Sequence, residues 1–183
     1  MPSPPITSSP PAGRSPIAIR LAREDDSAAI AAIYNQGIAE GIATFETEPR
    51  SAADIARQFR EKDARFPTLV AERAGRIVAF AGAGPYRTRP CYAGIAEHSV
   101  YVEAGERRTG AGGAALEALI QTYEQLGFWK LVSRIFPENH ASLALHDRLG
   151  FRQVGIYRRH ARLAGIWRDC IIVERLLGPA AQD

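Results

Sequence analysis

The chain has 183 residues, of which 46% are hydrophobic and 23% charged, an ordinary balance for one globular domain large enough to bury a core. A formal net charge of only +3 argues against nucleic acid as the main partner, whereas a pI near 9.1 is compatible with a small anionic ligand. No apolar run approaches the roughly 20 residues of a membrane-spanning helix, and the two cysteines, Cys91 and Cys170, lack the spacing of metal ligands. We therefore expect a cytoplasmic protein with free thiols, no metal and no membrane partner.

The predicted domain spans residues 17–178 and is flanked by two tails. Residues 1–16 contain six prolines and four serines with almost no apolar bulk, so they cannot bury enough surface to offset the entropy of ordering. They are predicted to be a disordered tail, and residues 179–183 a short C-terminal tail. The domain begins with a strand at residues 17–22, where apolar residues alternate with others.

Two helices are predicted after this strand. Glu24, Asp25 and Asp26 place acidic residues at a helix start, and apolar residues then recur at helical spacing as far as Ile38. Ser51 to Asp54 resembles a capping box that begins the second helix. The pair Phe66-Pro67 is predicted to end it, because the residue before a proline is pushed out of the helical region.

A β-hairpin and a basic loop follow. Residues 68–72 and 77–84 read as two strands around a glycine-containing turn. The polar loop at residues 85–92 contains Arg87 and Arg89, whose planar guanidinium groups match the oxygens of an acidic group such as a carboxylate. Either arginine is a candidate for binding an acidic substrate, and Arg87 is the better one.

The most informative stretch runs from residue 97 to residue 115. It predicts a strand at 98–102, a charged turn, and a glycine-rich loop opening a helix that ends near Gln125, before Gly127. The free N–H groups at that helix start, its positive dipole end and two nearby arginines favour a phosphate or pyrophosphate. Two interpretations compete: a Rossmann turn, formally fitted by Gly110, Gly112 and Ala115, or a different anion loop. The second is favoured because a Rossmann glycine follows its strand almost directly, whereas seven residues intervene here.

The last third of the chain predicts three strands and a short helix. The strands lie at residues 130–135, 151–157 and 170–177, and the helix lies at 142–149, closed by Gly150. A basic segment at 158–162 is predicted to link the last two strands in solvent. The resulting order, strand-helix-helix-strand-strand-strand-helix-strand-helix-strand-strand, indicates an α/β domain with a mixed, mostly antiparallel sheet flanked by helices.

This order and several motifs resemble the GNAT acetyltransferases. Arg107-x-x-Gly110-x-Gly112 is similar to the (Q/R)-x-x-G-x-(G/A) loop that holds coenzyme A in this family. Asn139-His-Ala-Ser142, followed by Leu145-His-Asp-Arg-Leu-Gly-Phe151, is similar to a later family signature. More narrowly, Tyr34-Asn35 and the segments 44–49, 97–102 and 165–169 resemble the phosphinothricin, methionine sulfoximine and arsinothricin acetyltransferases.

The resemblance implies a GNAT fold and an enzyme that moves the acetyl group of acetyl-CoA to the α-amine of a small glutamate-like amino acid, giving resistance or detoxification. It places the general base at Glu97, and a proton donor or substrate-orienting group at His146. His98 faces away from Glu97 by the period of two along a strand, and is assigned to packing or support. A homodimer is also implied, with Trp167 and the C-terminal strands as contributors.

The remaining sites follow from the same resemblance. In GNAT proteins a bulge splays the catalytic strand from its neighbour, and the pantetheine arm lies along the open edge like an added strand. The predicted cofactor-binding residues are Val100, Tyr101, Val102, Arg107, Arg108, Thr109, Gly110, Ala111, Gly112, Gly113, Asn139 and Ser142, with the choice between the two arginines left open. The predicted substrate-binding residues are Tyr34, Thr44, Phe45, Arg87, Arg89 and Glu97.

Three alternatives remain open at this point. The chain could be a catalytically silent domain that binds coenzyme A, a nucleotide-dependent oxidoreductase, or a protein N-terminal acetyltransferase. The last would need an open groove in place of a closed small pocket.

Overall fold

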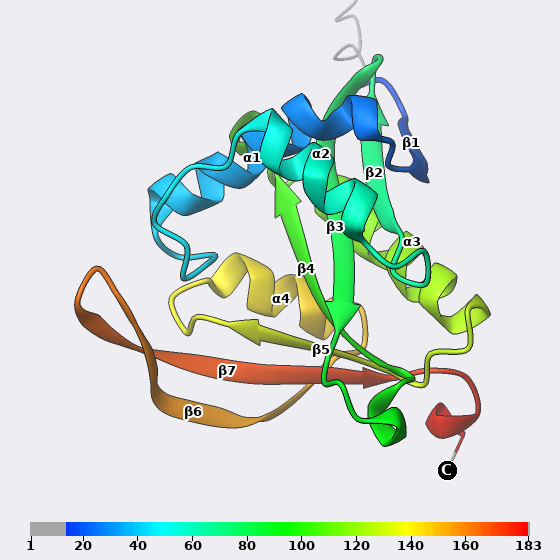
Figure 1. Cartoon of the computed structure of the whole chain (residues 1–183), viewed down its shortest axis with the longest axis vertical. Coiled ribbons are helices and arrows are strands. Elements are labelled where there is room, and N and C mark those ends of the chain that lie inside the picture. Colours follow the sequence, from blue (N-terminus) through cyan, green and yellow to red (C-terminus); the bar gives the residue numbers. More distant parts are fainter. Residues whose placement is uncertain (1–13, 183) are drawn as a thin grey trace, which may run out of the picture.

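One seven-stranded sheet carries the fold, in the order β1-β2-β3-β4-β5-β7-β6 (Figure 1). The computed structural model describes residues 14–182, so residues 1–13 of the predicted tail lie outside it. All neighbouring strands pair antiparallel except β4 and β5, which confirms the predicted mixed, mostly antiparallel sheet. The strands are β1 (Ile17–Leu21), β2 (Thr68–Arg73), β3 (Arg76–Pro85), β4 (Ile95–Val102), β5 (Lys130–Ile135), β6 (Arg152–Leu163) and β7 (Ile166–Leu176).

Four α-helices of the described chain cover the two faces of the sheet, and their order along the chain is the predicted one. They are α1 (Ser27–Glu40), α2 (Ala52–Glu61), α3 (Ala111–Gln125) and α4 (His140–Arg148). Val70 and Phe80 pack with Ile30 and Ile55 of α1 and α2 on one face. The alternate strand residues, such as Ala71 and Ala79, pack with α3 and α4 on the other. No helix within residues 14–182 has the length and apolarity to cross a bilayer.

Two predicted helix boundaries differ from the structure. The helix α2 ends at Glu61, before the predicted stop at Phe66-Pro67, because Lys62 is extended (φ −73°, ψ 132°) and Phe66 N donates to Asp63 O at 2.9 Å to close a separate turn. The helix α4 begins at His140, two residues earlier than predicted, because Asn139 caps it.

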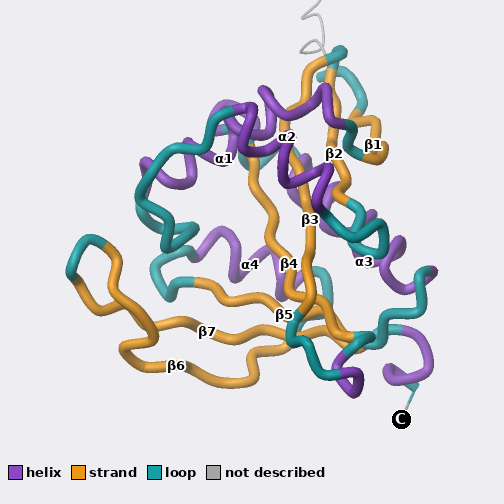
Figure 2. Tube along the Cα trace, viewed as in Figure 1, coloured by secondary structure: helices purple, strands orange, loops and turns teal. Residues whose placement is uncertain are grey.

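The segment at residues 158–162 is largely exposed, as predicted, but the prediction that it is a linker between strands was wrong. Figure 2 shows this segment as strand, within the long β6–β7 hairpin. Ala164 and Gly165, both with positive φ, form the turn instead. The β6–β7 register shifts between Tyr157 and Ala161, and there Arg159 N donates to Asp169 Oδ1 at 2.7 Å. Arginines suit this edge strand, since charge on an edge opposes pairing with other chains.

Candidate active site

Strand β4 is paired on both sides along only part of its length. Its register with β3 is continuous from Ala96 to Val102, whereas its parallel pairing with β5 covers only residues 95–97. Beyond Glu97 the two strands diverge (Figure 1). The resemblance implies a bulge here, but the β3–β4 register shows no shift. The divergence of β4 from β5 is therefore what opens this edge. An extended chain can add to such an edge through main-chain hydrogen bonds.

The loop between β4 and α3 is held from behind by Arg73. The Arg73 guanidinium is largely buried, pairs with Glu106, and donates to Thr109 O at 3.2 Å. The hydroxyl of Thr109 donates to the carbonyl of Glu106 at 2.7 Å. These contacts fix the loop before any ligand arrives.

Two positions of this loop require glycine, each for a different structural reason. Gly110 has φ +91°, a backbone conformation that disfavours any Cβ, and it caps the N-terminus of α3. A Cβ on Gly112 would lie 2.8 Å from Val102 Cγ2, so α3 approaches the end of β4 this closely only because Gly112 has no side chain. The free N–H groups at the start of α3 are thereby placed beside the end of the open edge, where an anion is favoured.

The two loop arginines differ in their partners. Arg107 donates to Glu40 Oε1 at 2.7 Å. Arg108 is exposed and has φ +59°. Within residues 14–182, no carboxylate lies at ion-pair distance from Arg108. Its charge is therefore available to an anionic ligand.

Glu97 lies in β4 where the strands begin to diverge. Its Oε1 accepts a hydrogen bond of 2.5 Å from Arg134 Nε on β5. Arg134 Nη1 in turn lies 3.2 Å from His160 Nε2 on β6. His160, which the sequence placed in solvent, is exposed but belongs to this chain of contacts around the candidate base.

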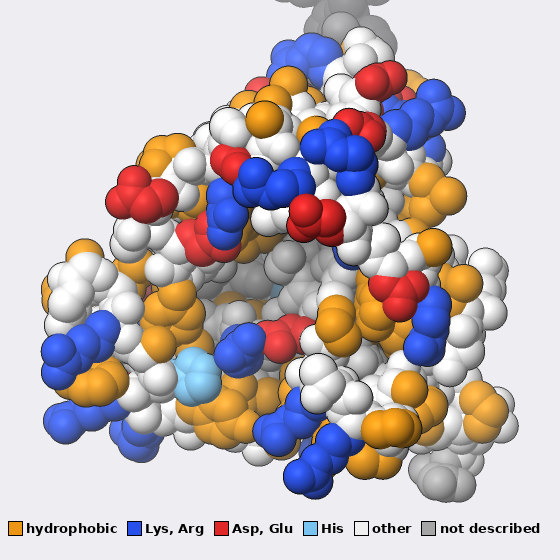
Figure 3. Space-filling model, viewed as in Figure 1, with side chains coloured by type: hydrophobic (Ala, Val, Ile, Leu, Met, Phe, Trp, Pro, Cys, Tyr) orange, Lys and Arg blue, Asp and Glu red, His pale blue; other side chains and the backbone are white. Residues whose placement is uncertain are grey.

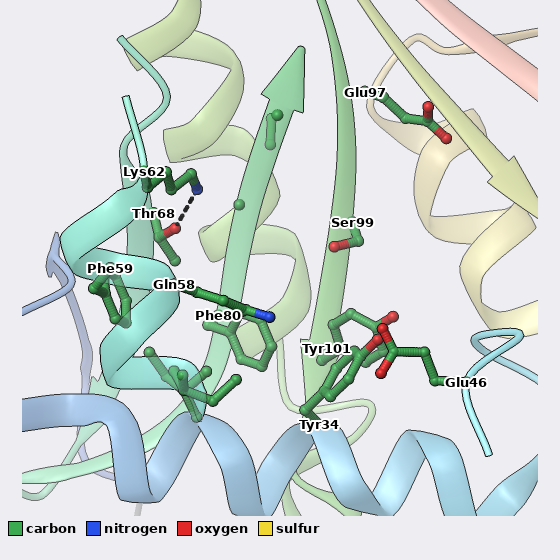
Figure 4. Close-up of a pocket in the computed structure, with 15 residues that line it drawn as sticks. Tyr34, Glu46, Gln58, Phe59, Lys62, Thr68, Phe80, Glu97, Ser99 and Tyr101 are labelled. Carbon is green, nitrogen blue, oxygen red and sulfur yellow. Dashed lines mark hydrogen bonds between the residues drawn. The ribbon is translucent and has the colours of Figure 1, made fainter. Parts of the chain in front are cut away.

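A cavity of about 320 Å³ lies between helices α1 and α2 and the face of the sheet that carries Glu97. Figure 3 shows this side of the molecule hollowed near its centre. Gly82 and Gly84 of β3 leave the space open. The cavity is lined by Ile30, Tyr34, Glu46, Ile55, Gln58, Phe59, Lys62, Thr68, Phe80, Gly82, Ala83, Gly84, Glu97, Ser99 and Tyr101, most of which Figure 4 labels.

Of the predicted substrate-binding residues that precede α2 in the chain, Tyr34 lines the cavity and Phe45 does not. Tyr34 lines the cavity; its hydroxyl lies 3.3 Å from Thr44 Oγ1, and its ring meets Tyr101 edge-on at 4.8 Å. Burial raises the pKa of Tyr34 and of Tyr101, so both hydroxyls stay protonated at neutral pH. Phe45 instead packs edge-on against Phe136 at 4.7 Å and is not among the lining residues.

Arg87 and Arg89 line a second cavity of about 450 Å³ rather than the first. The guanidinium of Arg87 lies over the rings of Tyr86 and Tyr92, at 5.2 and 5.8 Å. Lys62 and Gly84 line both cavities, so the cavity that the two predicted arginines line adjoins the one that Glu97 borders.

Sequence reasoning missed Lys62. Its ammonium lies in the first cavity and donates to Thr68 Oγ1 at 2.9 Å. Burial lowers its pKa to about 8. The sequence did contain one signal for it: of the 23 basic residues, only Lys62 and Lys130 are lysines. A lysine is better suited than an arginine to a buried position, because an ammonium can lose its proton there and a guanidinium cannot.

His146 lies on the opposite face of β4 from Glu97 and forms a buried pair with His98. The two Nε2 atoms are 3.0 Å apart, and His146 Nδ1 donates to Ser142 O at 2.7 Å. The neutral His146 therefore accepts from His98 at Nε2. Burial lowers the pKa of both rings, so the pair is uncharged at neutral pH. His98 Nδ1 is buried and, within residues 14–182, has no hydrogen-bond partner.

Asn139 and Ser142 stand at the start of α4. Asn139 Oδ1 accepts from Ser142 N, and its Nδ2 donates to Ile42 O, both at 3.1 Å. The Asn139 side chain thus caps α4 and ties it to the loop after α1.

Known proteins that are similar to this chain in sequence and fold are acetyltransferases. The model of the acetyltransferase (GNAT) family matches residues 30–151. A phosphinothricin N-acetyltransferase from Alcaligenes faecalis is 35% identical, over 87% of this chain and 82% of that protein. An L-methionine sulfoximine/L-methionine sulfone acetyltransferase from Pseudomonas paraeruginosa is 34% identical, over 88% and 95%. The crystal structure of a phosphinothricin acetyltransferase from Sinorhizobium meliloti, in complex with AcCoA, has a TM-score of 0.84 and 30% identity, with 91% of both chains covered. The predicted resemblance is confirmed, and the chain belongs to the GNAT acetyltransferase family.

Proposed function

We propose that this protein is an N-acetyltransferase that moves the acetyl group of acetyl-CoA to the α-amine of a small glutamate-like amino acid. One observation carries the proposal: Glu97 borders a cavity of small-molecule size at the point where β4 leaves β5. Relatives that are named for phosphinothricin and for methionine sulfoximine support the substrate class. Arsinothricin belongs to the same class, and resistance or detoxification is the role that such acetylation serves.

In this proposal the cofactor enters along the open edge of β4. The main chain of Val100, Tyr101 and Val102 binds the pantetheine arm as an added strand. The pyrophosphate binds at the N–H groups of residues 109–113, with Arg108 rather than Arg107 supplying the charge, because Arg107 is paired with Glu40. Asn139 and Ser142 contact the cofactor from the start of α4.

Glu97 acts as the general base. An α-amine is mostly protonated near neutral pH and must lose a proton before it can attack, and a carboxylate at the edge of the cavity can accept it. The amine nitrogen then bonds to the thioester carbon, the carbon–sulfur bond breaks, and coenzyme A leaves as a thiolate. The nitrogen loses its surplus proton to solvent as the amide forms, the thiolate takes one proton from solvent, and Glu97 returns its own proton to solvent. Arg134 holds the Glu97 carboxylate in place throughout.

We assign His146 a positioning role in place of proton donation to the thiolate. Its side chain is 2% exposed, and both of its ring nitrogens are engaged, one by Ser142 O and one by His98. A group in these contacts holds α4 against β4, beside the open edge along which the cofactor arm lies in this proposal.

A homodimer in the cytoplasm is also part of the proposal. Large apolar side chains are exposed along the β6–β7 hairpin, which makes it the preferred contact surface; they are Val154, Ile156, Tyr157, Ile166 and Trp167. Sedimentation of the purified protein tests this, and a monomer at all concentrations would remove it.

The test of the function is Glu97→Gln, with Glu117→Gln on the exposed side of α3 as the control. Loss of general base catalysis should lower kcat by about 10²- to 10⁴-fold, while the Kd for acetyl-CoA measured by calorimetry stays within a factor of about 2. The acceptors are phosphinothricin, L-methionine sulfoximine, L-methionine sulfone, arsinothricin, glutamate, a polyamine and a peptide N-terminus. Acetyl-CoA binding without consumption of any acceptor would indicate a silent domain, and wild-type turnover by Glu97→Gln would remove Glu97 as the base.

A further inference from the structure

The cavity beside Glu97 contains one positive charge that no group of the described chain compensates. Its two acids, Glu46 and Glu97, are each already paired with an arginine. Lys62 has a different environment: its ammonium donates to a hydroxyl, Thr68 Oγ1, and desolvation is the one influence that shifts its pKa. Within residues 14–182 no carboxylate lies at ion-pair distance from Lys62.

The local structure directs Lys62 into the cavity. It is the first residue after α2, and its extended backbone turns the side chain away from the helix axis. Figure 4 shows the side chain reaching toward Thr68 at one end of the cavity. A Cβ on Gly82 would lie 2.9 Å from Thr68 Oγ1, so the glycine makes room for the hydroxyl that holds the ammonium.

Burial without a counter-ion is unfavourable for an ammonium. The lowered pKa of Lys62 still leaves the group mostly protonated at neutral pH. An anionic group of a ligand would therefore find both a charge and a polar partner at this end of the cavity.

The sheet register sets the distance between Lys62 and the candidate base. Thr68, Gly82 and Ser99 form one row across β2, β3 and β4, so Thr68 and Ser99 are two strand spacings, about 10 Å, apart. Glu97 lies two residues from Ser99 and shares its face of β4. Those two residues add about 7 Å along the strand, at right angles to the roughly 10 Å across it, so the main chains at Thr68 and Glu97 are about 12 Å apart. An extended glutamate-like acceptor with a hydrogen bond at each end can span the gap between the two charged groups.

We infer that Lys62, supported by Thr68, binds the side-chain acid of the acceptor amino acid. The inference rests on the proposed function and adds selectivity within its substrate class. An acceptor with an anionic phosphinate or carboxylate in its side chain is preferred over one with a neutral sulfone, because the neutral group leaves the buried ammonium unpaired. The α-carboxylate is left to the side of the adjoining cavity, which Arg87 and Arg89 line.

Steady-state kinetics with phosphinothricin and L-methionine sulfone test the inference. Lys62→Met should raise the KM for phosphinothricin by about 10- to 100-fold, the usual effect of losing a hydrogen bond to a charged group, and change the KM for methionine sulfone by less than about threefold. Thr68→Val, a near-isosteric change, should give a smaller rise for phosphinothricin alone. Arg57→Gln, on the exposed side of α2, is the control and should change neither value. An unchanged Kd for acetyl-CoA shows that each variant is folded.

Every other outcome overturns either this inference or the proposed function. Equal losses for both acceptors in Lys62→Met would mean that Lys62 binds the α-carboxylate, and no loss for either would mean that it does not touch the acceptor. Wild-type protein that prefers methionine sulfone would overturn the inference and keep the proposed function. Wild-type protein that acetylates neither compound, nor any other α-amine, would overturn the function itself.

Discussion

Replacing Lys62 with methionine should stabilise the fold at neutral pH while it weakens acceptor binding. Burial lowers the pKa of this lysine from 10.5 to about 8. Each unit corresponds to about 1.4 kcal/mol, so the buried ammonium lowers the free energy of unfolding by up to about 3.5 kcal/mol below pH 8. Methionine keeps the aliphatic stem but loses the hydrogen bond to Thr68, about 1 kcal/mol. The expected net gain is up to about 2.5 kcal/mol.

The pH dependence identifies the cause of this gain. The unfolded chain holds the Lys62 proton up to about pH 10.5, whereas the folded chain releases it near pH 8. The unfolded state therefore binds more protons between these values, and the wild type gains stability relative to Lys62→Met as the pH rises through them. Urea unfolding at pH 7 and pH 10 measures both points, with Arg57→Gln expected to stay within about 0.5 kcal/mol of wild type. A Lys62→Met variant less stable than wild type at both pH values would refute the reasoning.

Two further predictions concern the elements on either side of the open edge. His98→Leu should leave the neighbouring ring of His146 unpaired and lower the free energy of unfolding by about 1–3 kcal/mol. The variant should also lose less stability than wild type as the pH falls below about 6.5. The reason is that burial lowers the pKa of both rings, so the unfolded chain takes up protons in this range that the folded chain does not. The urea midpoints of unfolding, measured from pH 8 to pH 5, test this, with His140→Asn at the start of α4 as the control. A His98→Leu variant with the same pH dependence as wild type would count against a buried, uncharged pair of His98 and His146. Gly112→Ala should weaken acetyl-CoA binding, measured by calorimetry, by about 5- to 100-fold through a clash worth about 1–3 kcal/mol. Val102→Ala in the same chain should restore most of that affinity, whereas unchanged binding by Gly112→Ala alone would contradict the close approach.

Local patterns were sufficient for the order of elements and for the glycine loop. The strand at β4 and the start of α3 are each encoded by a few adjacent residues, so periodicity and spacing were enough to place them. Lys62 and Arg134 could not be found this way. Each reaches the site from a different element, and only the tertiary arrangement brings Lys62 to Thr68 and Arg134 to Glu97.

The same limit explains the wrong linker at 158–162 and why the contact between the two histidines was not predicted. The segment at 158–162 looked like a linker because its charges hide the strand pattern, and the shift in register near Asp169 is a property of two paired strands. The depth of His146 depends on its contact with His98, which is 48 residues away along the chain. Neither fact has a local signature.

The divergence of β4 from β5 gives the sheet an edge in its interior. An edge on the outside of a sheet is a template for pairing with other chains, and proteins suppress it to avoid aggregation. Here the edge lies between two strands of the same sheet, near α4, where a foreign β-strand would have to enter between elements already joined at residues 95–97. The molecule can therefore keep unpaired main-chain groups for a ligand without offering them to a second protein chain.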